Sequence, residues 1–144
     1  MIYSYAVAVV GAATSFSLLA MVCMTGCDPK AGVRVVRDGT GYVVEVTNCS
    51  SKSRPMGVQG LVVRKDGAGQ ASGNTCELTA KISGGSLELW HYGEEVAQFQ
   101  LVKCSPLERG AAYVVDVATH PGGALGHFTI DAHGDVKMID GECR

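Results

Sequence analysis

The fold prediction starts from residues 33–48, which read VRVVRDGTGYVVEVTN. Two valine-rich runs flank the Asp-Gly-Thr-Gly sequence of residues 38–41. Asp and Gly between two apolar runs favour a tight turn, so this stretch predicts a β-hairpin. In the second run Tyr42, Val44 and Val46 share one face, and this period of two is typical of a sheet with one face in solvent.

The rest of the chain repeats this pattern of short apolar runs separated by Gly, Asp, Asn and Ser. No long stretch after the N-terminal segment keeps helical periodicity, and 19 glycines disfavour long helices. We therefore expect an all-β fold, an antiparallel β-sandwich of about seven to nine strands. Two of the runs, 87–92 and 96–103, are expected to form a second hairpin. The predicted strands cover residues 33–37, 42–48, 58–65, 76–82, 87–92, 96–103, 112–118, 126–132 and 136–140.

One segment carries a family resemblance. Residues 107–117, LERGAAYVVDV, have the form L-x-x-G-x-x-Y-x-V-x-V. This resembles the corner that leads into the sixth strand of fibronectin type III and related immunoglobulin-like domains, although Arg109 stands where those domains often have Pro. The resemblance implies that Gly110 permits the turn, that Tyr113 caps a backbone group across the corner, and that the domain is an immunoglobulin/fibronectin III-like sandwich. It implies no chemistry, because such sandwiches serve many functions.

Charge divides the chain into two parts. The 144 residues carry a net charge of −2, which disfavours nucleic acid as a partner, and 47% are hydrophobic, which excludes global disorder. All 12 Lys and Arg and all 14 Asp and Glu lie at or after position 28. An uncharged apolar leader therefore precedes a single polar domain.

The leader ends in the sequence Met24-Thr25-Gly26-Cys27. This resembles the lipobox of bacterial lipoproteins. The resemblance implies that residues 1–26 are a signal peptide and that Cys27 receives a diacylglycerol and becomes the first residue of the mature chain. Residues 27–32 would then be the lipidated cysteine with a short tether, and residues 33–144 the sandwich domain. Two alternatives remain open, an uncleaved membrane anchor and plain signal cleavage, and all three place the domain outside the cytoplasm.

Four further cysteines follow Cys27, namely Cys49, Cys76, Cys104 and Cys143. An even number in an exported domain favours two disulfides, because that compartment is oxidising. Of the three possible connectivities we favour Cys49–Cys76 with Cys104–Cys143, which closes two loops of moderate length. A zinc site is the competing interpretation, but no C-x-x-C spacing is present.

The remaining polar residues predict little chemistry. His120, His127 and His133 lie near the C-terminus at irregular spacing, so we expect exposed histidines and neither a metal nor another cofactor. Neither a Gly-x-Ser-x-Gly elbow nor a Ser-x-x-Lys motif occurs after the leader, so no catalytic residue is predicted.

The aromatic residues of the run 87–92 suggest a binding surface. Trp90 shares a face with Glu88 and Tyr92, opposite Leu87 and Leu89. If that face is the outer one, Trp90 and Tyr92 form a patch for an envelope protein or polysaccharide. If it is the inner one, the indole belongs to the core.

These observations predict a lipid-anchored accessory protein of the bacterial cell envelope, held to the membrane by its lipid. It would act as a binding or structural module and not as an enzyme. The alternative is a secreted inhibitor or immunity-type protein that inserts a loop, with residues 67–74 and 120–126 as the candidate loops.

Overall fold

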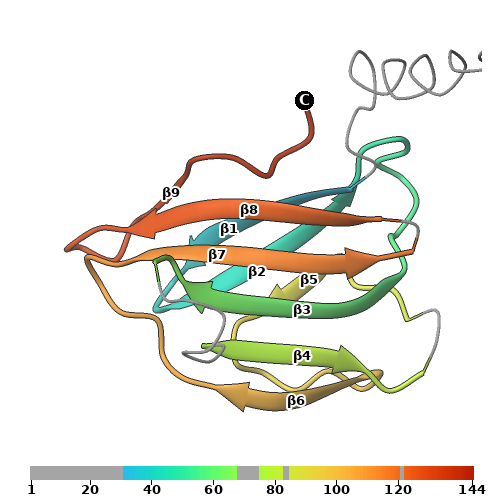
Figure 1. The fold of residues 1–144 in the computed structure, drawn as a ribbon, viewed down its shortest axis with the longest axis horizontal. Coiled ribbons are helices and arrows are strands. Elements are labelled where there is room, and N and C mark those ends of the chain that lie inside the picture. The colour runs from blue at the N-terminus through green and yellow to red at the C-terminus, as the bar shows by residue number, and fades with distance from the viewer. Residues whose placement is uncertain (1–30, 68–74, 83–84, 121) are drawn as a thin grey trace, which may run out of the picture.

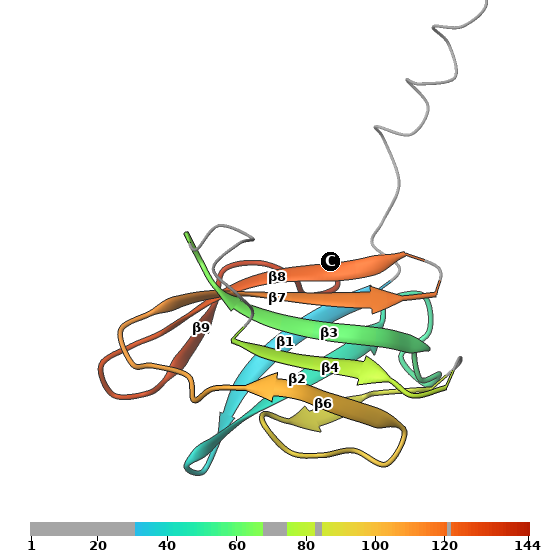
Figure 2. The ribbon, with the colours of Figure 1, turned by 60° about the horizontal axis from the view of Figure 1, so that its bottom comes forward.

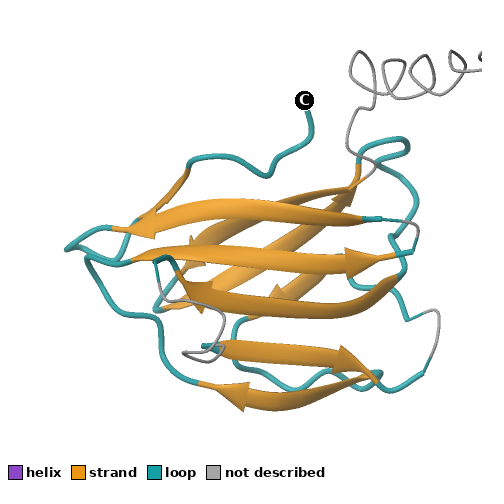
Figure 3. Cartoon of the chain, in the orientation of Figure 1, coloured by secondary structure: helices purple, strands orange, loops and turns teal. Residues whose placement is uncertain are grey.

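The computed structural model describes residues 31–67, 75–82, 85–120 and 122–144. Within these residues the chain forms nine strands and no helix (Figures 1 and 3). An all-β sandwich is thus confirmed, and each predicted run overlaps one strand. The strands are β1 (Ala31–Asp38), β2 (Gly41–Asn48), β3 (Val58–Lys65), β4 (Cys76–Ala80), β5 (Leu89–His91), β6 (Phe99–Cys104), β7 (Ala112–Thr119), β8 (Gly123–Ile130) and β9 (Val136–Met138).

The strands form two antiparallel sheets. The smaller has the order β1-β2-β5 and the larger the order β6-β4-β3-β7-β8-β9. In both ribbon views the smaller sheet lies against one face of the larger, and its strands run obliquely to those of the larger sheet (Figures 1 and 2). The two sheets therefore make a closed pair of layers with one core between them.

The hairpin expected from residues 33–48 is confirmed and is longer than predicted. β1 and β2 pair along their whole length, from Ala31 opposite Asn48 to Asp38 opposite Gly41. The expected boundary at residue 33 is therefore wrong, because residues 31 and 32 belong to β1 and not to a tether. Ala31 is buried in the core.

The second expected hairpin is also wrong. β5 pairs with β2 in the smaller sheet, whereas β6 pairs with β4 at the edge of the larger one. The chain between them makes a turn closed by the bond from the Glu94 amide to the His91 carbonyl. The chain then crosses from the smaller sheet to the larger one. Residues 91–94 therefore form a turn, but the strands on either side of it belong to different sheets.

The core consists of apolar side chains from both sheets. The largest fully buried ones are Trp90, Tyr113, Phe99 and Phe128, and the rings of Tyr113 and Phe128 stack at 5.5 Å. Burial of aromatic side chains of this size contributes much of the hydrophobic stabilisation. Outward-facing positions on the same strands are mostly polar, which reproduces the alternation in the sequence.

The corner before β7 has the local geometry that its sequence predicts. Gly110 has a φ of 77°, in the left-handed region that glycine adopts without strain. The backbone amide of Glu108 donates a 2.7 Å hydrogen bond to the Tyr113 hydroxyl, and Tyr113, Val115 and Val117 are buried. The tyrosine therefore caps the corner from inside the core.

The sandwich has two distinct ends. We call the end where β1 begins the entry end; it holds residues 49–57, 81–82, 85–88, 120, 122 and 141–144, and lies to the right in Figure 1. The far end holds the β1–β2 turn, residues 66–67, the corner 105–111 and the β8–β9 turn 131–135. The C-terminal segment returns to the entry end, where the Val33 amide donates to the Gly141 carbonyl at 2.8 Å. Each end of the sandwich is thus formed by loops from both sheets.

Candidate functional site

The exposed patch of Trp90 and Tyr92 is not formed. Trp90 is 1% exposed, pairs with Val44 across the sheet, and donates its indole N–H to the Glu94 carbonyl at 2.9 Å. The core interpretation of Trp90 is therefore correct, and the binding interpretation of this residue is wrong. Tyr92, by contrast, is half-buried and reaches the surface at the far end.

Tyr92 lines a surface groove of about 410 Å³, which we call the far-end groove. Tyr42 also lines the groove, and the Tyr92 amide donates to the Tyr42 carbonyl at 2.9 Å, so the two tyrosines lie side by side. Pro106 and Leu107, from the segment that leads to the corner, complete the apolar lining. The groove is lined by Thr40, Gly41, Tyr42, Tyr92, Gly93, Cys104, Ser105, Pro106 and Leu107.

The hydroxyls of both tyrosines hold neighbouring loops in place. The Tyr92 hydroxyl donates to the Ser105 carbonyl at 2.7 Å, and the Tyr42 hydroxyl donates to the Gly134 carbonyl at 3.2 Å. Burial raises the pKa of Tyr92 above its ordinary value of 10.0, so its hydroxyl stays a donor at neutral pH. The hydroxyls thus fix the positions of the rings, and the groove combines rigid aromatic walls with polar groups at its rim.

The lining of the groove supplies groups that can contact a ligand. Aromatic and proline surfaces contact apolar or ring-shaped groups, and the Thr40 and Ser105 hydroxyls can bond to amides or hydroxyls of a ligand. Sequence reasoning found Tyr92 and missed Tyr42, although both carry the same signal, an aromatic residue next to a glycine turn.

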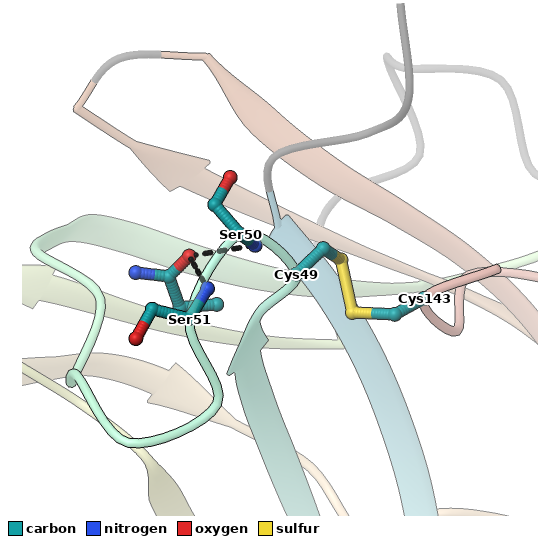
Figure 4. The surroundings of a disulfide bond; sticks show 5 residues. Cys49, Ser50, Ser51 and Cys143 are labelled. Atoms are coloured by element: carbon teal, nitrogen blue, oxygen red, sulfur yellow. Dashed lines mark hydrogen bonds between the residues drawn. A yellow bond between two sulfur atoms is a disulfide. The ribbon is translucent and has the colours of Figure 1, made fainter.

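The four cysteines form two disulfides, with a connectivity different from the one we favoured. Cys49 bonds to Cys143 at the entry end, and Cys76 bonds to Cys104 at the far end. Figure 4 shows the first bond beside residues 50 and 51, whose amides donate to the Asn48 side chain. The prediction failed because it preferred loops of similar length, whereas the pairing follows the sheet: Cys76 and Cys104 are register partners on β4 and β6.

The histidines lie apart from one another, and one of them has a partner that the sequence did not suggest. His127 lies on β8, and its Nδ1 is 2.9 and 3.0 Å from the two carboxylate oxygens of Asp140, which also accepts the His127 amide. These contacts hold the pKa of Asp140 below its ordinary value of 3.8. Among the described residues no three His, Cys, Asp or Glu side chains lie close enough together to hold a metal ion.

The acidic residues of the last turn serve its geometry. Asp131 accepts hydrogen bonds from the amides of His133 and Asp135 at 2.8 and 2.9 Å. These bonds lower the pKa of Asp131, the contact with the Asp135 amide having the largest effect. The turn is further held by Arg37, whose guanidinium contacts the Asp135 carboxylate at 2.9 Å.

The leader, the lipidation site and the two candidate loops were also predicted from the sequence. Cys27 and residues 1–26 lie outside the described residues, as does most of the candidate loop 67–74. The other candidate loop, 120–126, is wrong for its second half, because β8 begins at Gly123. Among the described residues no helix is long and apolar enough to cross a membrane. Comparison with known proteins found no matching family model, curated protein or solved structure.

Proposed function

We propose that this protein is a lipid-anchored accessory of the bacterial cell envelope and that its sandwich is a binding module whose ligand site is the far-end groove. The observation that carries the proposal is the position of β1. The strand starts at Ala31, which follows Cys27 by four residues in the sequence, and it runs from the entry end to the far end. An anchor at Cys27 would therefore hold the entry end at the membrane and present the groove to the surrounding space.

The dimensions support this orientation. Four residues span at most about 14 Å when fully extended, so a lipidated Cys27 leaves the entry end close to the bilayer surface. The eight residues of β1 then carry the chain about 26 Å further from the membrane. The far-end groove lies beyond the last residues of that strand, next to the β1–β2 turn.

The disulfides support an oxidising compartment outside the cytoplasm. They also suit a module that has to keep its shape there, because one bond ties each end of the sandwich. Cys104 belongs both to the far-end disulfide and to the lining of the groove, so that bond fixes one wall of the proposed site.

A kinship with fibronectin type III and immunoglobulin-like domains is part of the proposal. The corner at Gly110 and Tyr113 supports it, as does the arrangement of strands: β3, β7 and β8 are neighbours in one sheet, and the first two strands pair in the other. In this chain the corner leads into the seventh strand and not the sixth, because β6 is added at the edge beside β4.

Lipidation is tested by labelling cells with radioactive palmitate. We expect the wild-type protein and a Cys23→Ser control to incorporate label and Cys27→Ser to lose it. Intact mass of the purified protein should show a diacylglyceryl group on a chain that begins at Cys27. Undiminished labelling of Cys27→Ser would overturn the lipid anchor.

Binding through the groove is tested by site-directed photocrosslinking in isolated cell envelopes. A photoreactive residue replaces Thr40 at the rim of the groove, and a matched control replaces Lys137, which is exposed on β9. We expect a discrete adduct, with a protein or a glycan, from position 40 alone. Equal adducts from both positions, or none from position 40, would contradict a ligand site in the groove.

A further inference from the structure

The two ends of the sandwich carry opposite charge. At the entry end the adjoining segments 50–57, 81–82 and 85–88 contain three cations and one carboxylate, a formal net charge of +2. At the far end the turns 38–41, 66–67, 105–111 and 131–135 contain five carboxylates and one guanidinium. The flanking cations Arg37 and Lys65 pair with Asp135 and Glu108, so the formal net charge of these turns with their flanking cations is −2. The charge of the whole chain, −2, conceals this separation along the direction of β1.

The cations of the entry end belong to two loops that lie next to each other. Gly57 and Ser86 form a β-bridge, and the Leu87 amide bonds to the Met56 carbonyl. The loops carry Lys52 and Arg54 on one side of this contact and Lys81 on the other, and both loops lie at the end of the molecule where β1 begins (Figure 1). We call the exposed surface of these two loops, with Lys52, Arg54 and Lys81, the basic face.

The three cations of the basic face are accessible, although Lys52 lines a surface pocket together with Glu45 and Glu142. Lys52, Arg54 and Lys81 are exposed, and within the described part of the chain none of the three lies within ion-pair distance of a carboxylate. Beside Lys81, the side chain of Ile82 is 61% exposed. A cation beside an exposed aliphatic side chain suits the boundary between phospholipid headgroups and acyl chains.

The carboxylates at this end weaken the basic face only in part. Asp140 accepts hydrogen bonds from His127, and Glu142 lies 3.9 Å from the Arg34 guanidinium. Glu88 is the carboxylate that lies on the two loops themselves. Arg144, an exposed residue of the same end, adds a further cation.

We infer that the basic face docks on anionic phospholipid headgroups and so fixes the orientation of the domain on the membrane. This inference rests on the proposed lipid anchor, which places the entry end within about 14 Å of the acylated residue. The far end would be repelled from an anionic surface by its carboxylates. Tether and charge therefore select the same orientation, with the basic face down and the far-end groove up.

The test uses the purified lipidated protein in lipid nanodiscs, one set made of phosphatidylcholine and one of equal parts phosphatidylcholine and phosphatidylglycerol. Backbone hydrogen exchange of residues 50–57 and 81–82 should be several-fold slower in the anionic discs, and raised salt should remove the difference. Lys52→Glu with Lys81→Glu should abolish it. Lys103→Glu with Lys137→Glu, which changes the net charge equally but lies elsewhere, should leave it intact.

Equal exchange in the two kinds of disc, or equal effects of the two double variants, would overturn the inference. Failure of the proposed anchor is detected separately, as an unmodified Cys27 in the intact mass. In that case the unmodified protein is sedimented with vesicles made of equal parts phosphatidylcholine and phosphatidylglycerol. The inference then requires salt-sensitive binding that the Lys52→Glu, Lys81→Glu variant weakens on the order of 20-fold, and unchanged binding of this variant refutes it.

Discussion

The hydroxyl of Tyr113 offers a sharp test of how the corner holds the fold. Tyr113→Phe removes one oxygen and keeps the ring, which is 1% exposed and stacks on Phe128. The oxygen accepts the Glu108 amide at 2.7 Å in a partly buried place. Without it the amide loses its partner while the core remains filled.

The expected cost follows from that geometry. Leaving a partly buried backbone amide without an acceptor costs about 1–2 kcal/mol. For a domain of this size such a loss lowers the midpoint of thermal unfolding by about 4–10 °C. The matched control is Tyr92→Phe. In the wild-type protein the Tyr92 hydroxyl donates to the exposed Ser105 carbonyl. Water can replace that donor, so we expect a loss of about 0.5 kcal/mol or less.

The assay is reversible unfolding in urea at neutral pH, with both disulfides intact, followed by tryptophan fluorescence and circular dichroism. The Tyr113→Phe variant should show a lower midpoint with an unchanged slope, since the surface exposed on unfolding is the same. Equal losses for Tyr113→Phe and Tyr92→Phe, or no loss for Tyr113→Phe, would refute the role of the hydroxyl at the corner.

Three further predictions concern the C-terminal segment. Proteolysis without reduction should yield a peptide pair joined by Cys49 and Cys143, and a Cys49–Cys76 pair would contradict the fold. Replacing both Cys49 and Cys143 by serine should lower the free energy of unfolding by about 4 kcal/mol, because the bond closes a long loop. Gly141→Ala should lower the free energy of unfolding in urea by more than about 2 kcal/mol, since the φ of Gly141 is +108° and a Cβ would lie 2.6 Å from the Gly126 backbone. A loss below about 0.5 kcal/mol, which is typical of surface substitutions, would refute this packing. Because the pKa of Asp140 is lowered in the folded state, its contact with His127 stabilises the fold above pH 3.8 and ceases to do so as the pH falls below that value. The His127→Gln variant should therefore lose less unfolding free energy than wild type between pH 6 and pH 3. Equal losses would show that the pair contributes nothing.

Local patterns predicted the strands well because each depends on neighbours in the sequence. Alternation identified β2, and the glycine and tyrosine spacing identified the corner at Gly110. The same reasoning left the role of Trp90 open, because alternation does not say which face is inside. It was also misleading there: Leu87 and Trp90 are both buried, and Leu89 is 51% exposed. The period of two begins only at Leu89, where β5 starts.

Long-range relations were beyond the sequence for a different reason. The partner of Cys49 depends on where the C-terminal segment returns, and no local pattern records that path. The contact between His127 and Asp140 follows from the same return. Tyr42 and Tyr92 form one groove only because β5 joins β2 and not β6, so the candidate site depended on a pairing that a turn-like sequence had concealed.

The position of β1 has a mechanical consequence. If the proposed anchor and a partner at the far end were pulled apart, the force would act along the axis of this strand. Such a force would load the eight β1–β2 register pairs in shear, so that their backbone hydrogen bonds would resist it together and would not break one after another. The Cys49–Cys143 bond ties the end of β2 to the segment that flanks β1 on its other side. The strand that would receive the force is therefore held along both edges, and the domain is suited to transmit tension without unravelling from its N-terminus.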